Sequence, residues 1–170
     1  MKTTILVFHP NLTTTSTVNK LLAQTAKQAG FEVYDMYSLY SDFKIDVKAQ
    51  QKLVEQSKRI VLQFPIYWYQ VPPLLKQWFD DVLEYGWAYG STGKALQGKE
   101  LLLVPSFGGS LSDYQLDGRF KITIDEVLKP IQTIQYYTGS KFLEPFVTSS
   151  QFEEAKLQQA AKKYLEILKK

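Results

Sequence analysis

The chain of 170 residues contains no cysteine, a single histidine and no long apolar run. Without cysteine it can form neither disulfides nor thiolate metal sites, and it has no thiol nucleophile. The apolar run near the N-terminus, residues 5–8, is too short for the core of a signal peptide or for a membrane span. We therefore predict a cytoplasmic protein with no metal centre and no stable membrane insertion.

Arginine is also scarce, because Arg59 and Arg119 are the only two in the chain. The net charge of +3 comes mainly from scattered lysines, so no basic stripe is available to follow a nucleic-acid backbone. We expect no nucleic-acid partner. Neither a proline- and glycine-rich linker nor a block of like charges divides the sequence, which predicts a single domain over residues 1–170.

Two glycine-rich phosphate motifs are missing as well. The sequence has neither GxGxxG nor GxxxxGK[ST], which argues against a dinucleotide-type Rossmann site and against a P-loop. Strand-length apolar runs instead alternate with helical periodicity. The predicted strands are residues 5–8, 31–34, 60–64, 101–104 and 142–147. Right-handed crossovers make this an α/β fold with a doubly wound, five-stranded parallel sheet and helices on both faces. The short chain favours the flavodoxin-like strand order 2-1-3-4-5.

Proline and polar residues mark the starts of three predicted helices. One begins at the proline pair of residues 72–73, because a missing amide costs nothing in the first turn. Thr123 with Glu126 has the spacing of a capping box, and so has Ser150 with Glu153 before the last helix.

The segment after the first predicted strand, residues 9–19, has the sequence HPNLTTTSTVN and leads into a helix. Its run of hydroxyl side chains, together with free amides and the positive end of the helix dipole, suits a phosphate. A polar loop with a helix cap is the alternative interpretation. For His9, contact with a phosphate or a ribityl group is more plausible than catalysis, because a lone histidine here more often anchors a turn.

Two further loops leave the sheet at the same edge. Residues 65–69, after the third strand, offer aromatic faces and free backbone amides to a flat heteroaromatic ring, although an aromatic dimer interface is the alternative. After the fourth strand, Gly108 and Gly109 let the backbone approach a ligand, and the hydroxyl of Tyr114 is a candidate donor to a ring atom that gains charge. A plain turn with a surface tyrosine is the alternative there. Three such loops at one edge predict a site for a planar cofactor.

These loops resemble those of the NAD(P)H:quinone oxidoreductases with a flavodoxin-like fold, of the short bacterial NAD(P)H dehydrogenase and general stress protein type. QFPIYWYQVPPLLKQWFDDVL is similar to that family's QFP-aromatic-W-aromatic-x-VP-x-x-LK-x-WF-D/E-x-V signature. HPNLTTTSTVN resembles the family's phosphate loop, and SFGGSLSDY its glycine-pair loop that ends in tyrosine. The resemblance runs over nearly the whole chain.

The resemblance implies a bound FMN, with FAD as the alternative, and NAD(P)H as co-substrate. It implies that the phosphate lies near His9, Ser16, Thr17, Val18 and Asn19. It also implies that the flavin ring lies along Pro65, Ile66, Tyr67, Trp68 and Tyr69, with its pyrimidine edge at Ser106, Phe107, Gly108, Gly109 and Tyr114. Tyr114 is the one catalytic candidate. The mammalian enzymes have a histidine shortly after this tyrosine, and residues 115–120 contain none. The group that stabilises a reduced ring is therefore open between Tyr114, backbone amides and Arg119.

The resemblance also implies a reaction and a homodimer. We predict a two-electron, ping-pong transfer of hydride from NAD(P)H through the flavin to a quinone or a similar acceptor, with the partner chain closing each site. One rival is an ancillary regulatory subunit of a glutathione-gated potassium-efflux system, in peripheral association with a transporter. The other is a one-electron carrier of the flavodoxin type, which ranks last because such carriers are usually acidic. The choice between NADH and NADPH is open, and Arg119 is a candidate partner for a 2′-phosphate.

Overall fold

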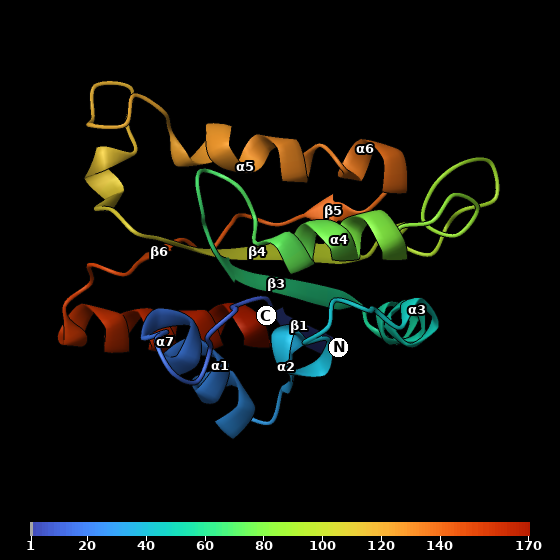
Figure 1. The fold of residues 1–170 in the computed structure, drawn as a ribbon, viewed down its shortest axis with the longest axis horizontal. Coiled ribbons are helices and arrows are strands. Elements are labelled where there is room, and N and C mark those ends of the chain that lie inside the picture. Colours follow the sequence, from blue (N-terminus) through green and yellow to red (C-terminus); the bar gives the residue numbers. More distant parts are fainter. Residues whose placement is uncertain (1) are drawn as a thin grey trace.

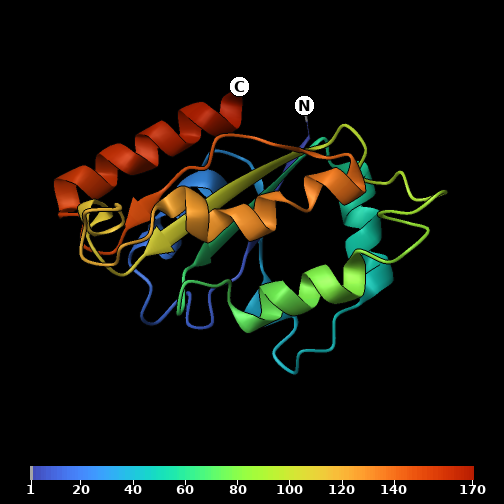
Figure 2. The same ribbon diagram turned by 90° about the horizontal axis from the view of Figure 1, so that it is seen from above.

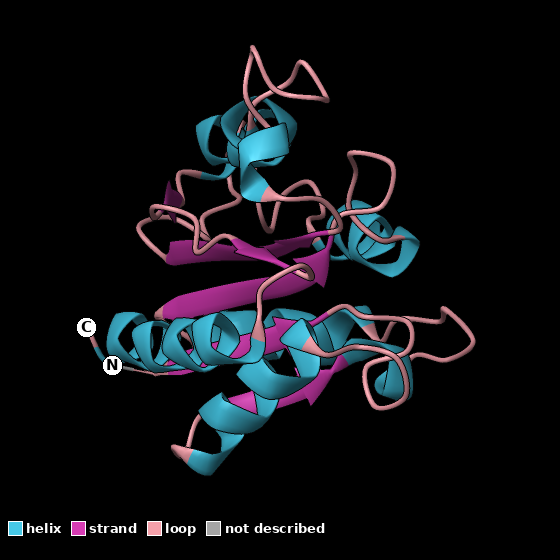
Figure 3. Cartoon of the chain, turned by 90° about the vertical axis from the view of Figure 1, so that its left-hand side faces the viewer, coloured by secondary structure: helices cyan, strands magenta, loops and turns pink. Residues whose placement is uncertain are grey.

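The computed structural model describes residues 2–170, which form a parallel β-sheet between two layers of helices (Figures 1 and 3). The strands are β1 (Thr3–Val7), β2 (Glu32–Asp35), β3 (Arg59–Pro65), β4 (Glu100–Phe107), β5 (Lys141–Phe142) and β6 (Thr148–Ser149). Their order is β2-β1-β3-β4-β5, with β6 also paired with β4, and every pairing is parallel. The predicted flavodoxin-like order is confirmed.

The edge of the sheet differs from the prediction of one continuous fifth strand. The structure has two short strands there, β5 and β6, which pair with different parts of β4. Lys141 lies opposite Glu100 and Thr148 opposite Ser106, so the edge segment contains one more residue than the stretch of β4 beside it. Pro145 lies within this segment and has no N–H to donate, which accounts for the interruption.

Seven helices and one 3₁₀ turn connect the strands of residues 2–170. They are α1 (Val18–Gln28), α2 (Met36–Leu39), α3 (Val47–Gln56), α4 (Pro73–Val82), η1 (Leu111–Asp113), α5 (Ile124–Gln132), α6 (Gln135–Thr138) and α7 (Glu154–Lys169). None of these helices combines the length and the apolar character that a membrane span requires.

Alternate residues of the central strands face opposite helical layers, because successive side chains of a strand point to opposite faces. Ile5, Val61 and Leu102 pack against α1 and α7. Leu6 and Leu62, one residue along, pack with the layer that contains α3, α4 and α5. Figure 2 shows α4 and α5 lying across the same side of the sheet.

Two of the three predicted helix starts are confirmed. Helix α4 begins at Pro73, and Thr123 and Glu126 form both hydrogen bonds of a capping box at α5. The predicted box of Ser150 and Glu153 is wrong, because Glu153 is the N-cap of α7 without a side-chain capping bond. Ser150 Oγ instead lies 3.3 Å from the carbonyl oxygen of Gly108, to which it donates, so it belongs to the edge where β4 ends.

Candidate functional site

The three predicted loops lie around two adjoining cavities at the edge where β1, β3 and β4 end. The first has a volume of about 290 Å³ and is lined by His9, Thr15, Ser16, Thr17, Val18, Asn19, Pro65, Ile66, Tyr67, Ser106, Phe107, Gly108 and Ser150. The second has a volume of about 300 Å³ and is lined by Ile66, Trp68, Tyr69, Gly108, Gly109, Asp113, Tyr114, Arg119, Phe120 and Gln151. Ile66 and Gly108 line both, and every residue predicted for the site lines at least one cavity.

The first loop leads to the open end of helix α1. Thr17 is the N-cap, but its side chain makes no capping hydrogen bond, and the first turn carries no acidic residue. The amides of that turn therefore lack the partner that a capping side chain usually provides. Since Ser16, Thr17 and Val18 line the first cavity, these donors and the positive end of the helix dipole are available to an anion there.

His9 is held in one orientation by the backbone. Its Nδ1 accepts a hydrogen bond of 3.1 Å from the amide of Asn11, so the neutral ring carries its proton on Nε2. Burial lowers the pKa of His9, an effect that the carboxylate of Asp35 opposes. The ring is therefore suited to donate a hydrogen bond to a ligand oxygen at neutral pH.

The aromatic loop is a tight two-residue turn. Tyr67 and Gln70 exchange backbone hydrogen bonds of 3.0 and 2.9 Å, and Trp68 and Tyr69 at the tip have φ angles of 50° and 63°. Such angles are unusual for bulky residues and match a type I′ turn. The amides of Ile66 and Tyr67 are not free as predicted, since they donate to Ser106 and Gln70. The amides of Trp68 and Tyr69, at the tip of the turn, have no hydrogen-bond partner among residues 2–170.

The third loop combines an open glycine with a buried tyrosine. No atom lies within 4 Å of the position a Cβ would take on Gly108, whereas on Gly109 it would lie 2.8 Å from the ring of Phe120. Tyr114 is packed between Phe107 and Phe120, with ring centroids 4.6 and 4.8 Å away. Burial raises the pKa of Tyr114, and Tyr69 and Asp113 raise it further, so its hydroxyl stays protonated and able to donate at neutral pH.

A buried polar network lies beneath the first cavity and ties its loops together. The side-chain amide of Asn19 donates to Ser106 Oγ at 2.8 Å, and that of Gln63 donates to the carbonyl of Asn19 at 2.8 Å. Tyr164 of α7 donates to Gln63 Oε1 at 3.4 Å. Because Asn19 lies in the first turn of α1 and Ser106 near the end of β4, this network fixes the first loop relative to the third. It also means that the side chain of Asn19 already has hydrogen-bond partners within the fold.

Several cavity residues were not predicted from the sequence. Ser150 and Gln151 follow β6, and their position after an edge strand is a signal that could have identified them. Gln63 lines neither cavity but supports the first from beneath, and a polar residue within an apolar strand is also a recognisable signal. Arg119, which the sequence left as an open candidate, does line the second cavity.

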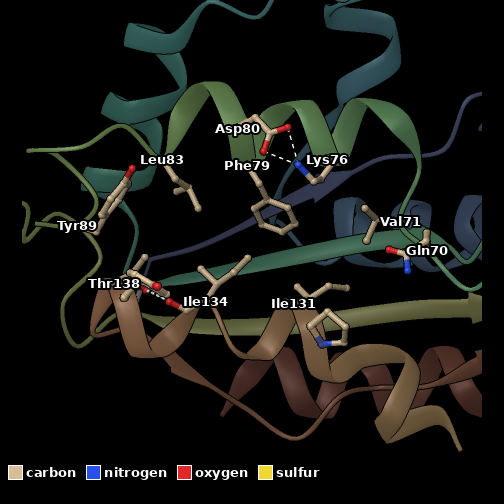
Figure 4. Close-up of a pocket in the computed structure, with 12 residues that line it drawn as sticks. Gln70, Val71, Lys76, Phe79, Asp80, Leu83, Tyr89, Ile131, Ile134 and Thr138 are labelled. Carbon is tan, nitrogen blue, oxygen red and sulfur yellow. Dashed lines mark hydrogen bonds and ion pairs between the residues drawn. The ribbon is translucent and has the colours of Figure 1, made fainter.

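A larger cleft, which Gln70 of the aromatic turn also lines, lies between α4 and the segment that contains α5 and α6 (Figure 4). Its volume is about 500 Å³. Phe79 of α4 and Leu83, the residue after this helix, face Ile131 and Ile134 across it. Tyr137, which is 76% exposed, stands at one end. No pattern in the sequence predicted this cleft.

Fold and cavities together define a doubly wound α/β protein with a candidate ligand site at the carboxyl edge of its sheet. The family model described as "Flavodoxin-like fold" matches residues 1–168, and the chain belongs to this family. It is 51% identical over 147 residues to the uncharacterized NAD(P)H oxidoreductase YrkL of Bacillus subtilis, a match that covers 86% of this chain and 84% of the relative. It is 37% identical over 162 residues to the glutathione-regulated potassium-efflux system ancillary protein KefF of Klebsiella aerogenes, with 94% and 90% covered.

Solved structures share the fold over almost the whole chain. General stress protein 14 of Treponema denticola, in complex with FMN, has a TM-score of 0.92 and 42% identity, with 99% of this chain and 98% of that chain covered. An NADPH-quinone reductase from P. pentosaceus has a TM-score of 0.86 and 29% identity, with 98% and 97% covered. A structure described as a thermophilic tryptophan halogenase from Streptomycin violaceusniger has a TM-score of 0.93 and 43% identity, with 98% of each covered. Fold alone therefore does not decide the reaction.

Proposed function

We propose that the protein is an FMN-dependent NAD(P)H:quinone oxidoreductase. The observation that carries this proposal is the pair of adjoining cavities, with an uncapped helix start at one end and an aromatic turn at the other. The names of the relatives and the FMN complex of a structural neighbour support it. Such a reaction uses the intracellular pool of reduced nicotinamide coenzyme, so we propose that the protein acts in the cytoplasm.

The first cavity fits the phosphate of FMN. Ser16, Thr17 and Val18 would hold it with hydroxyls and with the amides of the α1 start, and no lysine is needed because the helix dipole supplies positive potential. His9 would add a donor from Nε2. The network of Gln63, Asn19 and Ser106 would keep this cradle in place when it is empty.

The boundary between the two cavities fits the flavin ring. Trp68 and Tyr69 offer their amides, and Gly108 leaves the backbone open because no side chain fills the space beside it. Tyr114 would donate a hydrogen bond to the ring edge, since its raised pKa keeps the hydroxyl protonated. Bound FMN would supply the hydride chemistry itself.

The second cavity would bind the two substrates in turn. With a volume of about 300 Å³, it has room for the nicotinamide ring of NAD(P)H or for a quinone. Aromatic residues around it, Trp68, Tyr69 and Phe120, suit either planar ring. Alternate occupation of one cavity favours the predicted ping-pong order.

We further propose a homodimer in which a second copy covers the cleft between α4 and α5. Its apolar lining and the exposed tyrosines Tyr85, Tyr136 and Tyr137 support an interface, because contiguous apolar surface of this kind is unusual on a free monomer. Tyr85 and residues 86–99 would then lie close to the partner chain.

Steady-state kinetics test the proposed function. The protein is reconstituted with FMN, desalted and assayed for oxidation of NADPH and NADH in the presence and absence of a benzoquinone. We expect quinone-dependent turnover that requires retained FMN. Retention of FMN without oxidation of either coenzyme would contradict the reductase proposal.

The 37% identity to KefF supports a second candidate, an ancillary subunit in peripheral association with a potassium-efflux transporter. A tagged copy of the chain, expressed in its source cells and extracted with mild detergent, should then bring down a transporter. Recovery of a transporter together with the absence of turnover would favour this candidate over the reductase.

A further inference from the structure

The two arginines of the chain have different surroundings. Arg59 is buried, pairs with Glu100 at 2.7 Å and donates to the carbonyl of Ile167 at 3.0 Å, so its charge is used within the fold. Arg119 forms no ion pair with any of residues 2–170. It lines the second cavity, with its guanidinium carbon 5.5 Å from the ring centroid of Phe120. Its charge is available to a ligand.

The backbone that carries Arg119 is held firmly. A Cβ on Gly118 would lie 2.6 Å from the carbonyl oxygen of Asp113, so only glycine permits the close approach of this loop to η1. The amide of Phe120 donates to the same carbonyl at 3.0 Å, and its ring packs 4.8 Å from that of Tyr114. Arg119 therefore lies at the cavity rim between Gly118 and Phe120, whose backbone positions are fixed by their contacts with Asp113.

The remaining charges near Arg119 do not neutralise it. Asp113 also lines the cavity and keeps its negative charge, but it forms no ion pair with Arg119, and its carboxylate accepts a hydrogen bond from the amide of Ser110 as part of the η1 capping box. Lys121 is directed to the carbonyl of Asp117 and does not line the cavity. Arg119 is the one basic residue among those that line the second cavity.

We propose that Arg119 binds a phosphate of the nicotinamide coenzyme while the nicotinamide ring occupies the second cavity. This inference rests on the proposed function. A guanidinium presents a planar set of donors that matches phosphate oxygens, and its position at the rim leaves the aromatic interior to the ring. The coenzyme carries phosphate in two places, the diphosphate common to NADH and NADPH and the 2′-phosphate of NADPH alone. Both share the chemistry that Arg119 recognises.

The test compares Arg119→Gln and Arg119→Lys with the parent, all loaded with FMN. Lys156→Gln is the matched control, because Lys156 is also exposed and lies 4.3 Å from a phenylalanine ring, that of Phe152, but lines neither cavity. Calorimetric titration with NADP⁺ and NAD⁺ measures Kd without turnover, and KM and kcat are measured with the reduced coenzymes.

We expect Arg119→Gln to weaken coenzyme binding by about tenfold, with KM raised in parallel, kcat nearly unchanged and FMN retained. Arg119→Lys should lose less affinity for the coenzyme, because lysine keeps the positive charge but not the planar pair of donors. Lys156→Gln should bind the coenzyme as the parent does. An equal loss for both coenzymes identifies the diphosphate as the ligand, and a loss confined to NADP⁺ identifies the 2′-phosphate.

Unchanged Kd values in Arg119→Gln, with FMN retained and the parent active, overturn the inference and leave the proposed function intact. Loss of FMN from this variant overturns it too, because Arg119 would then serve the cofactor. A parent that retains FMN but binds neither coenzyme overturns the proposed function itself, and the inference with it.

Discussion

The cavities at the carboxyl edge and the cleft between α4 and α5 are lined by different kinds of structure. The cleft is larger, but most of its lining comes from the helices α4, α5 and α6, and its clearest polar feature is an ion pair of Lys76 with Asp80, already satisfied within α4. The cavities are lined by loops with an uncapped helix start, unpaired amides at the turn of Trp68 and Tyr69, and an arginine without an ion pair. Unmet hydrogen-bonding capacity, rather than volume, therefore distinguishes a site for a polar ligand from a site for a protein surface.

The largest contrast in stability should come from two tryptophans. Trp78 of α4 is buried and donates to Gln50 Oε1 at 3.0 Å, whereas Trp68 is 92% exposed on the turn. We expect Trp78→Ala to cost about 3–5 kcal/mol of unfolding free energy and Trp68→Ala less than about 1 kcal/mol, measured by urea unfolding. In the FMN-loaded protein, Trp68→Ala should nevertheless lower kcat/KM for the quinone. Equal losses of stability in the two variants would contradict the contrast.

Two buried glutamines allow the carboxyl edge of the sheet to be compared with the helical layer. Gln63→Leu removes the acceptor of the Tyr164 hydroxyl and the side-chain donor to the carbonyl of Asn19, which we expect to cost about 1–3 kcal/mol of stability. It should also weaken FMN binding by about tenfold, or ~1.4 kcal/mol, because Asn19, which connects the first loop to Ser106, loses its support from Gln63.

Gln50→Leu is the control for this variant. Gln50 is similarly buried and bonds Tyr40 and Trp78 away from the cavities. It should lose comparable stability while the folded protein keeps its FMN affinity, measured by quenching of flavin fluorescence. Equal weakening of FMN binding in both variants would show that the effect reflects general instability rather than positioning.

A charge introduced at the cleft should weaken dimer formation and leave the cavities at the carboxyl edge of the sheet unaffected. Tyr137 is exposed, so Tyr137→Asp should fold normally but weaken self-association by about tenfold or more, because it introduces a charge into an apolar interface. Leu39→Asp, at an exposed position on α2, is the control. Analytical ultracentrifugation measures both, and a parent that sediments as a monomer at all concentrations contradicts the dimer.

The smallest effect concerns His9. Its pKa is lowered by burial, so between that lowered value and the ordinary value of about 6.5 the unfolded chain binds a proton that the folded chain does not. Unfolding free energy should therefore rise with pH across this window, and His9 contributes no slope above or below it. In FMN-free protein, His9→Gln should remove this part of the slope in urea unfolding between about pH 5 and pH 8. Identical slopes would contradict the assignment.

The sequence predicts much of the site because of a topological rule. Parallel strands end at one edge, so the residues after the first, third and fourth strands are brought together whatever the details of their loops. The order 2-1-3-4-5 follows from the same alternation of strands and helices.

The features that the sequence does not predict depend on contacts between distant segments. The bonds of Gln63 require the register of three strands and the position of α7, and the split edge strand depends on one inserted residue near Pro145. Ser150 has the spacing from Glu153 of a capping box, but its hydroxyl donates to the carbonyl of Gly108 instead. The local sequence pattern does not distinguish a hydrogen bond to the start of α7 from one to the distant carbonyl of Gly108.

An anaerobic titration of the FMN-loaded protein tests the central claim most directly. Flavin absorbance is followed while NADPH or NADH is added, and then a benzoquinone. The proposed function predicts retained flavin that bleaches in a single two-electron step and regains its colour with quinone. Flavin that is retained but not bleached by either coenzyme would contradict the reductase, and a protein that retains no flavin would contradict the assignment of the two cavities.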